Sequence, residues 1–176
     1  MYHTRIPKGE LFSDLRTPTL TDKRKEGLVT SLYAGGIFIL LALIYIINAS
    51  SDLFGNISRF FTTLTLSQVP GTSISLPSPS NPAGFPLLYN AAFQFAFGLG
   101  IIELLILSLR IAMHSPLARK AETIENLVFW LATSYLIVTY LTNMTIISEW
   151  FVFWAGIILI AGFSLVARAF VLIINR

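Results

Sequence analysis

The sequence contains no cysteine, only two histidines and few charged residues. The absence of cysteine excludes disulfides, thiolate metal sites, iron–sulfur clusters, cysteine nucleophiles and palmitoylation. The histidines, His3 and His114, are too few and too far apart in the chain to suggest a haem or zinc site. Charged residues make up 12% of the chain, against about 25% in soluble domains, while hydrophobic residues make up 55%. A soluble domain of 176 residues has too little interior for so much apolar surface, so the composition indicates a protein solvated by lipid.

Four apolar runs are long enough to cross a bilayer as helices, which takes roughly 20 residues each. They cover 28–47, 87–113, 127–141 and 150–174. Between them lie a basic tail (1–27), a long loop (48–86), a polar helix start (114–126), a short turn (142–149) and a polar end (175–176). Ser115 and Pro116 predict the beginning of the third helix, with serine as its cap and proline at its first helical position. The predicted fold class is an all-α integral membrane protein with four transmembrane helices.

The long loop divides into two halves of different character. Over 52–66 the apolar residues recur at helical spacing, and Ser51 and Asp52 are suitable caps. This predicts an amphipathic helix that lies on the membrane surface, or packs against the bundle or a partner. The second half, 69–86, is rich in proline, serine and glycine, which predicts a linker.

The basic residues predict the orientation of the chain in the membrane. If the N-terminus is cytoplasmic, all of the twelve lysines and arginines except Arg59 fall on the cytoplasmic side. Cytoplasmic loops carry such an excess of basic residues, so both termini are predicted to be cytoplasmic. The expected location is a plasma or inner membrane.

Glu103 is the one acidic residue inside an apolar run. A carboxylate there costs a few kcal/mol unless it faces protein and has a partner. Arg110 lies two turns later on the same face, and Arg168 lies at a similar depth on the fourth helix, so a Glu103–Arg168 pair could form across the bundle. Glu103 is then either a proton or cation site in a transport path, or a structural carboxylate that fixes helix packing. The structural interpretation is favoured because no second acid or histidine lies nearby in the sequence.

Two further sets of residues are candidates for contacts within the membrane. The third helix carries many hydroxyls, which favour packing against other helices over a polar pore wall. They fall into two stripes, one with Thr133 and Tyr140 on the face of Asn126, the other with Tyr135, Thr139 and Thr142. The fourth helix has small residues at seven-residue spacing, Ala155, Gly162 and Ala169, which predict a seam where another helix approaches closely.

Three functions from different classes remain open. The favoured one is a non-catalytic accessory subunit of a larger membrane complex, such as a respiratory or photosynthetic assembly, because no catalytic constellation is visible in the sequence. The second is a small homo-oligomeric channel or transporter that uses Glu103, and the third is a membrane enzyme acting on lipid. We expect no cofactor of its own and no nucleic acid, but bound lipids and either other membrane subunits or further copies of the chain as partners.

Overall fold

The computed structural model describes residues 20–144 and 146–174, so the predicted tail up to residue 19 and the end at 175–176 lie outside the described residues. The long helices are α1 (Leu20–Ile47), α3 (Pro86–Ala112), α4 (Leu117–Leu136) and α5 (Ile147–Ile174). A π-helical turn, η3 (Ile137–Thr142), continues α4. With that extension, four helices in the described part of the chain are long and apolar enough to cross a membrane. The fold is that of an α-helical membrane protein with four candidate spanning helices.

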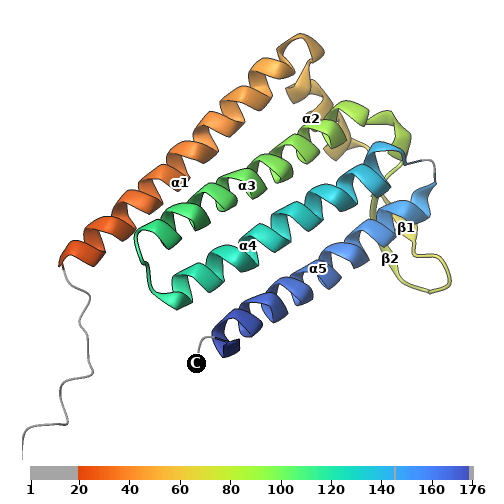
Figure 1. The fold of residues 1–176 in the computed structure, drawn as a ribbon. Coiled ribbons are helices and arrows are strands. Elements are labelled where there is room, and N and C mark those ends of the chain that lie inside the picture. The colour runs from red at the N-terminus through yellow and green to blue at the C-terminus, as the bar shows by residue number, and fades with distance from the viewer. Residues whose placement is uncertain (1–19, 145, 175–176) are drawn as a thin grey trace, which may run out of the picture.

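The long helices lie side by side in the order α1, α3, α4, α5 (Figure 1). α3 packs against α1 and α4, and α4 packs against α3 and α5. α1 and α5 therefore form the two edges of a row. We call the end of the row that holds the start of α1, the α3–α4 turn and the end of α5 the turn end. The opposite end, which holds α2 (Leu53–Thr62) and a β-hairpin, is the hairpin end.

Two helix boundaries differ from the sequence prediction. α1 begins at Leu20, not Leu28, because the lysine, arginine and glutamate residues of 23–26 are good helix formers and apolarity marks only the part suited to lipid. α4 begins at Leu117 with Pro116 in the cap position and no side-chain cap hydrogen bond, so Ser115 is not the cap. The chain reaches Pro116 through a tight turn in which His114 has a left-handed φ of 53°. The N–H groups of His114 and Ser115 donate to carbonyls in the last turn of α3, which closes that helix.

The predicted surface helix is shorter than expected, and the predicted linker contains a hairpin. α2 ends at Thr62, and two strands follow, β1 (Leu64–Gln68) and β2 (Ser75–Pro79), which pair antiparallel. Leu64 belongs to the strand and not to the helix because the 64–68 segment alternates apolar and polar side chains. The prolines of β2 are compatible with a strand because each lies at a position that makes no hydrogen bond to β1.

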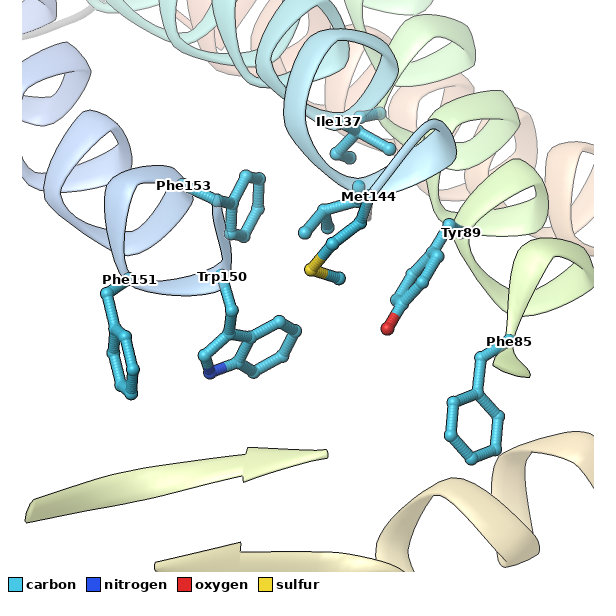
Figure 2. Close-up of a cluster of buried hydrophobic side chains, with 9 residues drawn as sticks. Phe85, Tyr89, Ile137, Met144, Trp150, Phe151 and Phe153 are labelled. Carbon is cyan, nitrogen blue, oxygen red and sulfur yellow. The ribbon is translucent and has the colours of Figure 1, made fainter. Parts of the chain in front are cut away.

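The apolar core lies at the hairpin end, between α3, η3 and α5 (Figure 2). Its largest buried side chains include Phe85, Tyr89, Trp150, Phe151 and Phe153. The indole N–H of Trp150 donates to the Pro77 carbonyl at 3.1 Å and so fastens β2 to the start of α5. α2 joins the core through Phe60, whose ring lies 5.3 Å from that of Phe85, while Phe54 remains 69% exposed. One side of α2 therefore packs against the bundle, and the other is open.

Candidate functional site: polar links at the turn end

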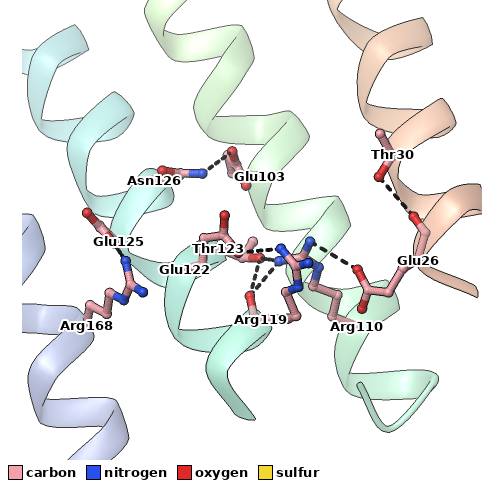
Figure 3. A network of polar contacts seen from close by, with 10 residues as sticks. All are labelled: Glu26, Thr30, Glu103, Arg110, Arg119, Glu122, Thr123, Glu125, Asn126 and Arg168. Carbon is pink, nitrogen blue, oxygen red and sulfur yellow. Dashed lines mark hydrogen bonds and ion pairs between the residues drawn. The ribbon is translucent and has the colours of Figure 1, made fainter. Parts of the chain in front are cut away.

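Glu103 is buried between three helices at the turn end. Its side chain is on α3, and the residue is only 2% exposed. The side-chain amide of Asn126, on α4, donates to a carboxylate oxygen of Glu103 at 3.1 Å (Figure 3). The hydroxyl of Tyr33, on α1, is a second hydrogen-bonding group for the same carboxyl. Burial of a carboxylate requires such donors, so Glu103 draws α1 and α4 towards α3.

Arg110 connects the same three helices two turns further along α3. Its guanidinium lies 3.6 Å from the carboxylate of Glu26 on α1, and only 12% of the side chain is exposed. It also donates to the Thr123 hydroxyl and to the Arg119 carbonyl on α4. Among the described residues its Nε has no hydrogen-bond partner. Arg110 thus places a largely shielded positive charge on the same face of α3 as Glu103.

Arg168 pairs with Glu125 and not with Glu103. The guanidinium of Arg168, on α5, lies 3.0 Å from the Glu125 carboxylate on α4. The predicted Glu103–Arg168 pair does not form, because α4 lies between α3 and α5 in the row and supplies the nearer carboxylate. The Arg168 side chain is 44% exposed, so this link is open to solvent or headgroups, unlike the Glu103 contact.

Together these contacts join every neighbouring pair of helices in the row at one end (Figure 3). Glu26 and Arg110 link α1 to α3. The Glu103–Asn126 and Arg110–Thr123 hydrogen bonds link α3 to α4. Glu125 and Arg168 link α4 to α5. The sequence pointed to Glu103, Arg110 and Arg168 but missed their partners Glu26, Tyr33 and Thr123. These partners lie on α1 and α4, and which helices adjoin α3 is visible only after folding.

A cavity of about 200 Å³ lies among these residues. Its polar wall includes Glu103, Arg110 and Asn126, and Arg119 and Glu122 line it further out. Arg119 and Glu122 lie three residues apart on α4 and form an ion pair at 3.1 Å. The cavity has room for a few water molecules or a small ion, since one water takes up about 30 Å³. It places carboxylate, amide and guanidinium groups around one small space.

The predicted hydroxyl stripes of the third helix divide between buried and exposed positions. Thr133 is buried, and its hydroxyl makes no hydrogen bond among the described residues. Tyr140 is partly buried against the core at the hairpin end. Tyr135 is 69% exposed, and exposed Thr139 donates to the Tyr135 carbonyl. Thr133 and Tyr140 therefore lie inside the helix row, while Tyr135 and Thr139 lie on its surface.

The small residues of α5 also face away from the other described helices. Ala155, Gly162 and Ala169 are exposed, and a Cβ at Gly162 would meet nothing within 4 Å. The close approach of α5 to α4 occurs instead at Gly156, where a Cβ would lie 2.7 Å from Leu136. The predicted seam is therefore exposed along the edge of the row.

A further polar link, which the sequence did not reveal, lies at the hairpin end. The side-chain amide of Asn48, directly after α1, donates to the side chain of Gln94 on α3 at 3.2 Å.

In the described part of the chain, no three histidine, aspartate or glutamate side chains are grouped as a metal site would require. Comparison with protein-family models, curated proteins and solved structures gives no match. The class that the fold defines is an α-helical membrane protein with four candidate spanning helices. Its distinguishing feature is a row of helices joined by polar links at one end and by an aromatic core at the other.

Proposed function

We propose that this chain is a non-catalytic structural subunit of a larger multi-subunit membrane complex, such as a respiratory or photosynthetic assembly. The main support is that the polar side chains at the turn end pair with one another within the chain. Glu103, Arg110 and Arg168 each contact a neighbouring helix of the same chain, in a role that stabilises a helix row. Intramembrane charges that pair in this way fix helix packing. A row so held offers a rigid surface for other chains.

The exposed small-residue face of α5 is the proposed contact surface. Helices in lipid associate where small residues let their backbones approach, because lipid gives apolar side chains no drive to leave it. Ala155, Gly162 and Ala169 lie on one face of an edge helix, where nothing in the described chain covers them. A helix of a partner subunit is the occupant that this face suits.

Purification from the native membrane tests the proposal. The chain, extracted in mild detergent through a C-terminal tag, is expected to bring larger membrane chains with it in stoichiometric amounts. Gly162→Leu should lose them, because the leucine fills the seam without touching the rest of this chain. Gly35→Leu is the matched control, since a Cβ at Gly35 on α1 also meets nothing within 4 Å. Isolation of the chain alone, or equal losses in both variants, would reject the proposal.

We also propose that the turn end is cytoplasmic. Arg110, Arg119, Lys120 and Arg168 belong to this end, as do the basic residues at the start of α1. Basic residues are concentrated on the cytoplasmic side of membrane proteins. Since the chain has no cysteine, single variants Ser115→Cys and Thr72→Cys report the two ends cleanly. In intact cells, a membrane-impermeant maleimide should label Thr72→Cys and spare Ser115→Cys; the reverse pattern would invert the orientation.

The cavity at Glu103 favours a second candidate function, a small homo-oligomeric channel or transporter. In that function the buried carboxylate takes up a proton or cation from the cavity at the turn end. Purified chain in liposomes should then carry flux, and Glu103→Gln should abolish it while the amide still accepts from Asn126. Glu125→Gln is the control that should keep its flux, because Glu125 pairs with Arg168 and does not line the cavity. Absence of flux in the unaltered chain would reject this candidate.

A further inference from the structure

The outer edges of the two hairpin strands differ in which backbone hydrogen-bonding groups they leave open. In the antiparallel ladder, the Ser80 N–H donates to the Thr63 carbonyl, and the Val69 N–H donates to the Ile74 carbonyl. Because hydrogen-bonded pairs alternate with non-hydrogen-bonded ones, the pairs at Leu64, Leu66 and Gln68 are non-hydrogen-bonded. The backbone N–H and C=O groups of these three residues therefore point away from β2.

The outer edge of β2 is closed to further pairing. Its outward positions include Pro77 and Pro79, which have no N–H to donate. The outward carbonyl of Pro77 is taken by the indole of Trp150. Proline at an edge strand is a common means of preventing pairing with another chain. On this side the hairpin is fastened to α5 and shielded.

Among the residues that the structure describes, no proline or side-chain hydrogen bond closes the outer edge of β1 in the same way. β1 lies on the side of the hairpin away from Trp150 (Figure 2). Leu66, in the middle of the strand, is 74% exposed. No charged residue occurs between Phe60 and Ile102, so the lysines that usually guard an edge strand are missing. An open, uncharged edge with outward donors and acceptors is suited to accept an added strand.

We propose that β1 pairs with β1 of a second copy of this chain, antiparallel about a twofold axis at Leu66, to form a four-stranded sheet over the hairpin end. The hairpin runs across the end of the helix row and not along it (Figure 1). Two copies in one membrane share their orientation and are related by rotation about the membrane normal. A half-turn reverses a strand that lies across this axis, so the two β1 strands meet antiparallel.

The strand is complementary to itself in this register. Leu66 pairs with its copy and exchanges two backbone hydrogen bonds, and Leu64 and Gln68 pair with each other on either side. Thr65 lies opposite Ser67 of the copy, so hydroxyls face each other and no like charges meet. The dimer uses the hairpin and leaves the α5 seam free, and it does not depend on the proposed subunit function.

Proline substitution tests the edge directly. Leu66→Pro removes only an N–H that points away from β2. Pro77, at the paired position of β2, lacks the same group in the natural hairpin, so the hairpin should still form. Purified Leu66→Pro is expected to have the mass of a monomer where the unaltered chain and Leu66→Val have that of a dimer. The loss of affinity should be at least about tenfold, which corresponds to about 1.4 kcal/mol. An unaltered chain that is monomeric in gentle detergent, or a Leu66→Pro dimer as stable as its parent, overturns the proposal.

Cysteine crosslinking tests the register within the membrane, even if the proline variant misfolds. Thr65 and Ser67 of the copy form a non-hydrogen-bonded pair, whose Cα atoms lie about 4.5 Å apart, within disulfide range. Cells that express Thr65→Cys and Ser67→Cys chains together should give a mixed dimer on mild oxidation. Thr72→Cys at the hairpin tip is the control for random collision. Mixed dimers that form no faster than Thr72→Cys dimers would overturn the antiparallel β1 pairing.

Discussion

The side-chain amide of Asn126 donates to a carboxylate oxygen of Glu103 across the α3–α4 interface, at 3.1 Å. Asn126→Leu removes a donor from a carboxylate that is 2% exposed, so it should destabilise the chain by about 1–3 kcal/mol. The double variant Glu103→Leu with Asn126→Leu should recover much of that loss, because neither polar group then remains buried alone. Thermal unfolding in detergent measures both; additive losses in the double variant would show that the two side chains are not coupled.

Gly100 permits the close contact of α3 with α4 in the middle of the row. A Cβ at this position would lie 2.5 Å from a methyl carbon of Leu131. Gly100→Ala should therefore cost about 1–3 kcal/mol through overpacking. Addition of Leu131→Ala should restore part of the loss, since it removes the colliding methyl. Gly162→Ala serves as the control and should not lower the thermal midpoint, because it gains helix propensity and its Cβ meets no other atom within 4 Å. A loss as large as that of Gly100→Ala would contradict the assignment.

Trp150 fastens the hairpin to the bundle through a single indole hydrogen bond, to the Pro77 carbonyl. Trp150→Phe keeps an aromatic ring in the core but loses this donor, which is worth about 1 kcal/mol. Amides of β1 and β2 should then exchange with deuterium about fivefold faster, while those of α3 and α4 stay protected. Trp154→Phe, at a residue 48% exposed, is the comparison that should not affect the hairpin. Unchanged hairpin exchange in Trp150→Phe would show that other contacts hold the strands.

Asp52 caps α2 with its carboxylate, which accepts from the Gly55 N–H at 3.2 Å, and it does so with a left-handed φ of 47°. Asp52→Ala loses the cap and places a residue poorly suited to this φ, so α2 should lose about 1 kcal/mol of local stability. Asp52→Asn keeps both the cap and the tolerance for this conformation. Hydrogen exchange at α2 should accelerate in the alanine variant only. Equal protection in the two variants would argue that packing of Phe60 alone maintains α2.

Arg110 and Arg168 should differ in their contribution to stability although both link helices. Arg168 is 44% exposed, and exposed ion pairs contribute about 0–1 kcal/mol, so Arg168→Gln should be nearly neutral. Arg110 is 12% exposed and contacts Glu26, Thr123 and a carbonyl, so Arg110→Gln should lower the thermal midpoint clearly more. Equal shifts in the two variants would show that burial does not distinguish the links.

Local sequence signals anticipated some elements and failed for others. The apolar runs located all four long helices because the length and hydrophobicity of a spanning segment are local properties. The hairpin was taken for a linker because the prolines of β2 suggest irregular chain. A proline is compatible with a strand only where its nitrogen points away from the partner strand. The register decides this, and it is set by the pairing of β1 with β2, which joins residues seven to fifteen positions apart in the chain.

The sequence by itself determined that the protein has four long apolar helices, that Glu103 and Arg110 share a face of one of them, and that no cysteine chemistry takes place. Helical periodicity and composition suffice for these conclusions. Only the tertiary structure decided that the helices form a row in the order α1, α3, α4, α5. Because a polar side chain in a bundle pairs with a group on the helix beside it, this order makes Asn126 the partner of Glu103 and Glu125 the partner of Arg168. The same order leaves Gly162 facing outward. The depth of a residue along its helix can be counted from the sequence, but which other helices that residue faces cannot.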